Sequence, residues 1–227
     1  RWDSFDLSIA TTPELLKHMD ENMEWARDIW CVHFRITEPS YLSMGLFQEL
    51  YEDLFEDDGP FAAMTLLQGF DNKTVETGHA LWDLSREVLD SPELVRVFRS
   101  VPAKDVLSTL ESLPEAQPFL RAFRSYLAKY GQRSDLWGMT DPSWIEDPTP
   151  AIENLKDNLE HPNRDPRAEL ATLAEERERA VAVALKRLES YPTPVVESFE
   201  LHLKAAQTGL VLSEDHGFWI DVAAVYR

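Results

Sequence analysis

A nine-residue stretch near the end of the sequence, 213–221, concentrates side chains that are able to do acid–base chemistry. It contains Glu214, Asp215 and His216, followed by a glycine and two large aromatic residues. A carboxylate beside an imidazole can orient the ring, raise its basicity and let it take a proton from a hydroxyl. The same residues also fit a helix start, with Ser213 as N-cap and the two acids placed favourably against the helix dipole. Both interpretations stay open, because helix N-termini are common places for functional sites.

A second histidine, His33, lies on the apolar face of a helix that the spacing of apolar residues predicts over 13–34. It follows Trp30 by about one helical turn and adjoins Phe34. A histidine in this position is either a core residue with one satisfied hydrogen bond or part of a functional site. The single cysteine, Cys31, lies on the same helix and is expected to pack rather than react.

Proline placement and apolar periodicity predict an all-α fold. Five of the seven Ser, Thr or Asp residues that directly precede a proline stand at the start of an expected helix, where each pair can supply an N-cap followed by a proline at the first helical position. We expect about nine to ten helices in one irregular helical domain that covers 1–227, with a long ordered loop near 132–147. The pairs begin at Thr12, Ser91, Thr149, Asp165 and Thr193. The expected helices are 13–34, 41–55, 74–89, 91–100, 104–113, 115–130, 150–159, 166–189 and 194–212.

Two of these helices carry more specific expectations. The helix over 194–212 is apolar on both sides and is therefore expected to be central. In the helix over 166–189, the run Glu175–Arg179 has charges at helical spacing and is expected to be a solvated face.

The composition narrows the possible partners. The net charge of −19 argues against a nucleic-acid surface and against binding to anionic membranes. No stretch is long and apolar enough for a transmembrane helix, and one cysteine suits a reducing cytoplasm. The expected partner is a small molecule or another protein domain. Both ends of the sequence indicate a fragment of a longer multidomain protein, since the apolar helical pattern continues to Arg227 without a stop signal.

Several kinds of site are missing from the sequence. It has no glycine-rich nucleotide loop, no His-Glu-x-x-His and no cysteine pair, so we expect neither a nucleotide site nor a zinc site on this chain. An all-α fold with acidic turns leaves a terpenoid-cyclase-like, Mg²⁺-dependent lyase as an alternative. The acidic pair Asp57-Asp58 is followed by Gly-Pro rather than by another helical acid, which disfavours that alternative.

Six separated strings carry a resemblance to a known family. They are WCVHF (30–34), LLQGFDNKT (66–74), ALWDL (80–84), YGQRS (130–134), PSWIEDP (142–148) and SEDHGFWID (213–221). In order and content they resemble the helical central domain of phosphoenolpyruvate-synthase-like dikinases. Relatives of these enzymes include rifampicin phosphotransferases, phenylphosphate synthases and 4-methylbenzyl phosphate synthases.

The resemblance implies that this chain is the acceptor-binding part of an ATP-dependent phosphotransferase. In such enzymes an ATP-grasp domain, with ATP and Mg²⁺, phosphorylates a histidine on a swivelling domain, and AMP and phosphate are the other products. The swivelling domain then delivers the phosphoryl group to an acceptor on the helical domain, here expected to be a small aromatic or alcohol. The alternative from a different class is a non-catalytic helical interaction module, which the acidic surface and the absence of nucleotide motifs also allow.

The resemblance also implies roles for individual residues. His216, oriented by Asp215 or Glu214, is the expected base, and Lys73 and Arg133 are expected phosphate partners. Acceptor binding is assigned to His33 and Gln68, which could fix its hydroxyl, and to Gln132, which stands where relatives commonly have histidine and cannot serve as a base. The residues expected to wall an apolar acceptor are Trp30, Phe34, Trp82, Trp137 and Trp219.

Overall fold

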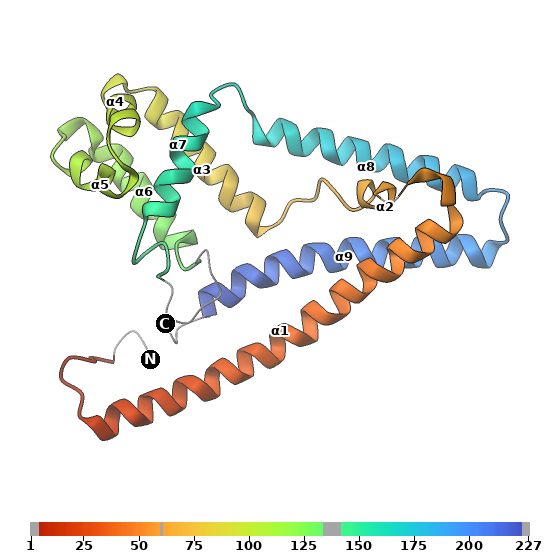
Figure 1. Cartoon of the computed structure of the whole chain (residues 1–227), viewed down its shortest axis with the longest axis horizontal. Helices are drawn as coiled ribbons and strands as arrows, with labels where there is room; N and C mark the ends of the chain where they lie inside the picture. The colour runs from red at the N-terminus through yellow and green to blue at the C-terminus, as the bar shows by residue number, and fades with distance from the viewer. Residues whose placement is uncertain (1–4, 60, 134–141, 224–227) are drawn as a thin grey trace. The chain divides into compact units, whose positions relative to one another are not determined.

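The computed structural model describes residues 5–59, 61–133 and 142–223, and in these ranges it contains nine α-helices, two short 3₁₀ helices and no strand (Figure 1). The all-α fold predicted from the sequence is confirmed. The chain divides into two compact units. Unit 1 comprises 1–29, 75–164 and 218–227, and unit 2 comprises 30–74 and 165–217.

Unit 1 is a bundle of short helices around an aromatic core. Within it α5 packs against α4, α6 and α7. The rings of Phe119 and Phe123 stack with centroids 5.9 Å apart, and Phe98 meets Phe119 edge-on at 5.5 Å. All three side chains are almost completely buried, which is the expected outcome for apolar residues at helical spacing. The helices are α3 (Lys73–Leu89), α4 (Pro92–Ser100), α5 (Ala103–Glu111), α6 (Gln117–Tyr130) and α7 (Thr149–Glu160).

Two of the predicted N-caps are present as side-chain hydrogen bonds. Ser91 Oγ accepts from the amide of Leu94 at the start of α4. Asp165 Oδ1 accepts from the amides of Arg167 and Ala168, at 3.0 Å and 3.2 Å, at the start of α8 (Pro166–Leu188). At α7 the predicted cap is wrong, because Thr149 lies inside the helix and Pro148 precedes it.

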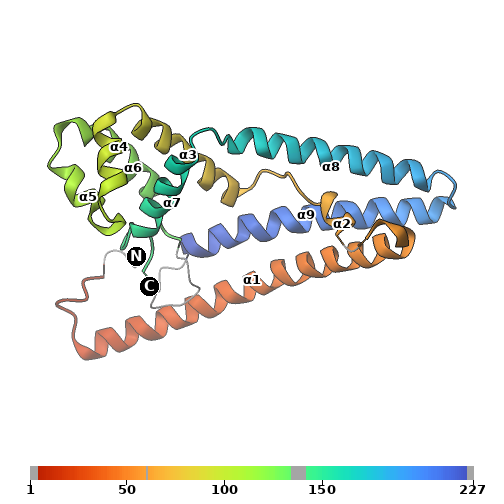
Figure 2. The same cartoon turned by 45° about the horizontal axis from the view of Figure 1, so that its top comes forward.

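Unit 2 is built from long helices that pack on a second aromatic core. Figures 1 and 2 show α8 running alongside α9 (Thr193–Ala223), with α2 (Ala62–Thr65) beside them. The core joins α1 (Thr12–Leu54) to α9, since the ring of Phe199 lies 5.6 Å from that of Phe47 and 6.0 Å from that of Phe55.

The two helices predicted over 13–34 and 41–55 are one continuous helix, α1, which passes through Pro39. Proline has no N–H and usually ends or kinks a helix. Here hydroxyls bond back to the preceding turn: Thr37 donates to the His33 carbonyl and Ser40 donates to the Ile36 carbonyl, at 2.9 Å and 2.7 Å. Close packing against α9 supports the same turn, because a Cβ on Gly209 would lie 3.0 Å from the Ser40 backbone.

The helix start predicted at Ser213 is also wrong, because α9 continues through this position to Ala223. The Ser213 hydroxyl donates back to the Leu210 carbonyl at 2.8 Å, as a serine inside a helix does. The sequence also led us to expect a central helix, because it is apolar on both sides, but part of its apolar surface is open to solvent. Leu201 is 67% exposed and Leu212 is 50% exposed, whereas Phe199, Leu203 and Ala206 are buried.

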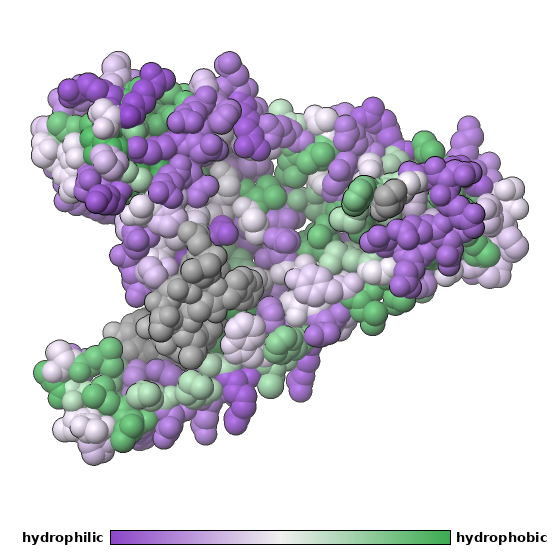
Figure 3. Space-filling model, in the orientation of Figure 1, coloured by the Kyte–Doolittle hydropathy of each residue, from purple (hydrophilic) through white to green (hydrophobic). Residues whose placement is uncertain are grey.

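The surface carries both polar and apolar residues (Figure 3). Hydrophilic residues predominate on the face in view, with apolar patches between them. In the part of the chain that the structure describes, no helix combines the length and the apolar character needed to cross a membrane.

Candidate functional site

The 66–74 segment of unit 2 runs from the end of α2 into the first residues of α3 and is held by side chains of α9. Gln207 on α9 donates to the Leu66 carbonyl at 2.9 Å. Farther along α9, Asp215 Oδ1 accepts from the Lys73 amide at 2.8 Å, and Glu214 Oε2 accepts from the Thr74 hydroxyl at 2.9 Å. The beginning of α3 is therefore fixed to α9 next to His216.

These contacts correct the roles predicted for Asp215 and Glu214. We expected them to orient the imidazole of His216, but in the structure their carboxylates face the beginning of α3. Consecutive residues on a helix point about 100° apart, so a carboxylate at position 215 is poorly placed to reach the next ring. Asp215 instead acts as a helix cap supplied from outside the helix, and its charge favours the positive end of the α3 dipole.

His216 pairs with His33 across unit 2. Their rings stack with centroids 5.3 Å apart and an interplanar angle of 27°. Both side chains are half-buried. The Nε2 atom of His216 is buried and has no hydrogen-bond partner among the described residues. The hydrogen-bonding capacity of this nitrogen is therefore not used within the described residues.

Two aromatic residues of α1 surround the His33 ring. Trp30 meets it edge-on with centroids 5.0 Å apart, and Phe34 does so at 5.3 Å. Trp30 is half-buried, whereas Phe34 is 54% exposed. The structure thus brings together two of the five predicted wall residues with the histidine pair, and one side of this aromatic cluster is open to solvent.

Burial lowers the pKa of both histidines. Burial is the cause for His33, and for His216 the largest cause is burial, followed by the nearby charge of His33. A pKa below the usual 6.5 keeps an imidazole neutral at neutral pH. A neutral ring can accept a proton, which a base requires.

The lowered pKa values predict a pH dependence of stability. A histidine whose pKa is lower in the folded state favours folding at high pH, and this contribution is lost as pH falls below the unfolded value, near 6.5. We therefore expect the free energy of unfolding to decrease as pH falls from about 7 towards about 5. Urea unfolding at several pH values should show this slope, and the double variant His33→Gln and His216→Gln should flatten it. An unchanged slope in the double variant would contradict the assignment.

Gln68 and Lys73 lie on the 66–74 segment of the same unit. Gln68 Nε2 donates to Glu176 on α8 at 3.1 Å, so its amide is already engaged within the protein. Lys73 begins α3 at the point that Asp215 caps. Their proposed contacts with an acceptor or phosphate stay predictions.

The remaining predicted residues belong to unit 1, apart from Trp137, which lies outside the described residues. Arg133 places its guanidinium carbon 4.8 Å from the centre of the Trp144 ring, and its Nε is buried with no hydrogen-bond partner in the described ranges. Gln132 precedes it and is half-buried. Trp82 donates to the Arg164 carbonyl at 2.9 Å, and Trp219 is 56% exposed.

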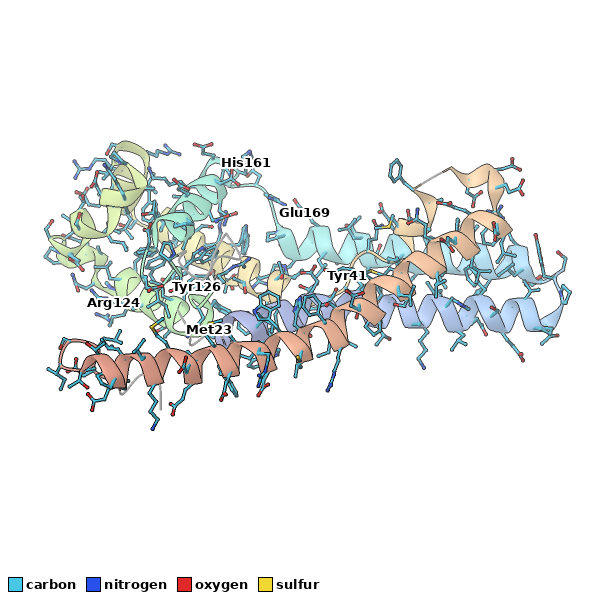
Figure 4. All side chains as sticks on the ribbon, turned by 60° about the horizontal axis from the view of Figure 1, so that its bottom comes forward. Met23, Tyr41, Arg124, Tyr126, His161 and Glu169 are labelled. Atoms are coloured by element: carbon cyan, nitrogen blue, oxygen red, sulfur yellow. The ribbon has the colours of Figure 1, made fainter. Side chains whose placement is uncertain are left out.

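Tyr126, on α6, is a buried polar residue of unit 1 that is not among the predicted site residues (Figure 4). Its hydroxyl is buried and has no hydrogen-bond partner among the described residues. Burial raises the pKa of Tyr126 far above its usual value, and the charge of Arg133 partly offsets this. The hydroxyl therefore stays protonated at neutral pH.

Arg177 is a second residue whose importance we did not predict from the sequence. We expected the run Glu175–Arg179 to be solvated, but the Arg177 side chain is only 14% exposed and contacts the 66–74 segment. Spacing could have indicated this, because Arg177 follows Ala174 by three and precedes Val181 by four residues, on the same stripe as the buried Ala184.

Asp58, one of the two acids considered for the terpenoid-cyclase alternative, has another role. Asp58 accepts from the Tyr51 hydroxyl at 2.9 Å and also pairs with Arg187, which lowers the pKa of its carboxyl. Among the described residues, no group of three or more His, Cys, Asp or Glu side chains could hold a metal ion.

Comparison with known proteins indicates a phosphotransferase family. A family model described as the rifampicin phosphotransferase fourth domain matches residues 33–214. Chondramide synthase cmdD of Chondromyces crocatus is 43% identical over 199 residues, which are 88% of this chain and 5% of that protein. An uncharacterized phosphotransferase, YvkC, of Bacillus subtilis (strain 168) is 27% identical over 191 residues, which are 83% of this chain and 22% of that protein. The chain therefore spans a small part of both relatives.

Proposed function

Because the chain belongs to the rifampicin phosphotransferase fourth-domain family, we propose that it binds the acceptor for ATP-dependent phosphoryl transfer. The family match supports its being a component of a phosphoryl-transfer enzyme. The proposed acceptor is a small aromatic or alcohol, held in unit 2. The observation that carries this proposal is the stacked His33–His216 pair, in which a buried imidazole nitrogen has no protein partner among the described residues.

The proposed chemistry assigns the proton to His216. A phosphohistidine domain, charged by an ATP-grasp domain with ATP and Mg²⁺, would supply the phosphoryl group. The acceptor oxygen forms its new bond to phosphorus as the bond from phosphorus to the nitrogen of the donor phosphohistidine breaks, and the donor imidazole leaves. The hydroxyl proton of the acceptor passes to the neutral Nε2 of His216. Proton transfer of this kind needs a nitrogen within hydrogen-bond reach and a pKa that leaves it unprotonated. The lowered pKa of His216 supports this role.

Other residues of unit 2 would orient the acceptor. His33 lies against the His216 ring and can offer or accept one hydrogen bond to the acceptor hydroxyl. Trp30 and Phe34 would contact an aromatic ring, since edge-to-face and offset contacts between rings are favourable. Lys73 would place a positive charge near the moving phosphoryl group, because its helix begins beside His216.

Reconstitution tests the proposal directly. The chain is combined with an ATP-grasp domain and a phosphohistidine domain, then supplied with ATP and a panel of phenols and aromatic alcohols. We expect acceptor-dependent formation of AMP and of a phosphorylated product, followed by phosphorus NMR. The chain alone should bind the acceptor in calorimetry and leave ATP intact. ATP consumption by the chain alone would contradict the proposal, and binding without any transfer in the reconstituted mixture would favour an interaction module.

A further inference from the structure

Arg177 on α8 makes three contacts with the 66–74 segment. Its Nη1 donates to the carbonyls of Gln68 and Gly69, at 3.0 Å and 2.8 Å. Its guanidinium carbon lies 3.9 Å from the centre of the Phe70 ring. One largely buried side chain therefore holds three consecutive residues of an irregular segment.

Gly69 brings this segment unusually close to α8. Its φ is +72°, a left-handed conformation that glycine adopts without strain. A Cβ at this position would lie 2.3 Å from the Ala174 amide nitrogen and 2.5 Å from the Leu173 carbonyl carbon. The segment thus lies directly against the α8 backbone, about one turn before Arg177. The Arg177 side chain then contacts Gln68, Gly69 and Phe70.

We propose that Arg177 is a positioning residue, which fixes the 66–74 segment so that α3 begins beside the His33–His216 pair. This inference rests on the proposed function. The segment is anchored at its start by Gln207 and at its end by Asp215, and Arg177 anchors its middle. Because Lys73 follows Gly69 by only four residues, a shift of the Gly69 backbone is transmitted to the beginning of α3.

The geometry requires an arginine. A planar guanidinium can donate to two neighbouring carbonyls while its face stacks on an aromatic ring. A lysine ammonium is a compact point charge on a flexible stem and cannot reproduce both contacts. Two carbonyls left without their donor would also lose hydrogen bonds in a half-buried place, which costs free energy.

The test uses Arg177→Met, which keeps the apolar stem and removes the donors, in the reconstituted enzyme. Hydrogen exchange followed by mass spectrometry should show faster exchange of the 69–73 amides, by about 10-fold or more. Transfer at saturating acceptor should fall about 10- to 100-fold, with a much smaller change in the KM for the acceptor, because misplacement by about 1 Å has effects of this size. Arg179→Met is the matched control, since Arg179 lies on the same helix, is exposed, and donates to the Glu175 carbonyl of its own preceding turn.

Three further variants, Arg177→Lys, Arg177→Ala and Arg179→Ala, separate positioning from general destabilisation. Arg177→Lys provides a milder change if the methionine variant does not fold, and it should show the same kcat effect to a smaller degree. Added guanidinium ion should restore at least part of the transfer rate of Arg177→Ala and should not change the rate of Arg179→Ala. Rescue of this kind is not expected for a protein that is simply less stable.

The outcomes test separately whether Arg177 anchors the 66–74 segment and whether this anchoring affects transfer. Unchanged exchange of 69–73 in Arg177→Met would overturn the anchoring of the segment. Faster exchange with unchanged transfer would overturn the positioning role. If the unmodified reconstituted enzyme transfers nothing, the proposed function fails and the positioning role with it, whereas the exchange result still reports on the anchoring alone.

Discussion

Replacing His216 with alanine is expected to lower acceptor phosphorylation by about 10²- to 10⁴-fold, the contribution that general base catalysis typically makes. The Nε2 of His216 is buried without a protein partner among the described residues, and burial keeps the ring neutral at neutral pH by lowering its pKa. Without the His216 side chain, the acceptor hydroxyl loses the group that we propose accepts its proton. Rate measurements in the reconstituted enzyme, with circular dichroism to verify the fold, would test this expectation.

A second histidine on α9 provides the matched control. His202 Nδ1 contacts the Ser198 carbonyl at 2.7 Å, so this ring is engaged with its own helix, and His202→Ala should retain most of the rate. In the unmodified enzyme, kcat should decrease as pH falls through the pKa of His216, which lies below 6.5. Full activity of His216→Ala together with loss of activity in His33→Ala would transfer the base role to His33.

The fold was predictable where local signals agree with tertiary packing. Apolar periodicity located the helices, and proline at the first helical position located the starts of α4 and α8. Prediction failed at Pro39 and Ser213, where the local residues favour a helix boundary. At both positions the tertiary structure outweighs the local preference for a helix boundary. Next to Pro39, α1 packs closely against α9 where Ser40 meets Gly209, and the Ser213 hydroxyl bonds back to the Leu210 carbonyl within α9.

Only part of the arrangement at the candidate site could be predicted from the sequence. Spacing and residue type indicated His33 and His216, and the structure stacks them in one unit. They did not reveal that Asp215 caps a different helix, because a contact between distant segments depends on the tertiary fold. Arg177 shows the same limit, since its charged neighbours hide its place on the buried stripe of α8.

Phe199→Ala is expected to destabilise unit 2 by about 3–5 kcal/mol, the usual range for truncating a buried aromatic side chain. Phe199 is 0% exposed, and its ring lies 5.6 Å from Phe47, 6.4 Å from Tyr51 and 6.0 Å from Phe55. Because these partners all belong to α1 or its end, the cavity would form where α1 meets α9. Urea unfolding monitored by fluorescence and circular dichroism would measure the change.

Leu201, two residues later on α9, supplies a control that also tests which side of the helix is buried. It is 67% exposed, so Leu201→Ala should change the free energy of unfolding by less than about 0.5 kcal/mol, as is usual for surface substitutions. Sequence alone does not separate these two residues, since α9 is apolar on both sides. Comparable losses from both substitutions would mean that the Leu201 side of α9 is also covered, and a small loss from Phe199→Ala would contradict the unit 2 core.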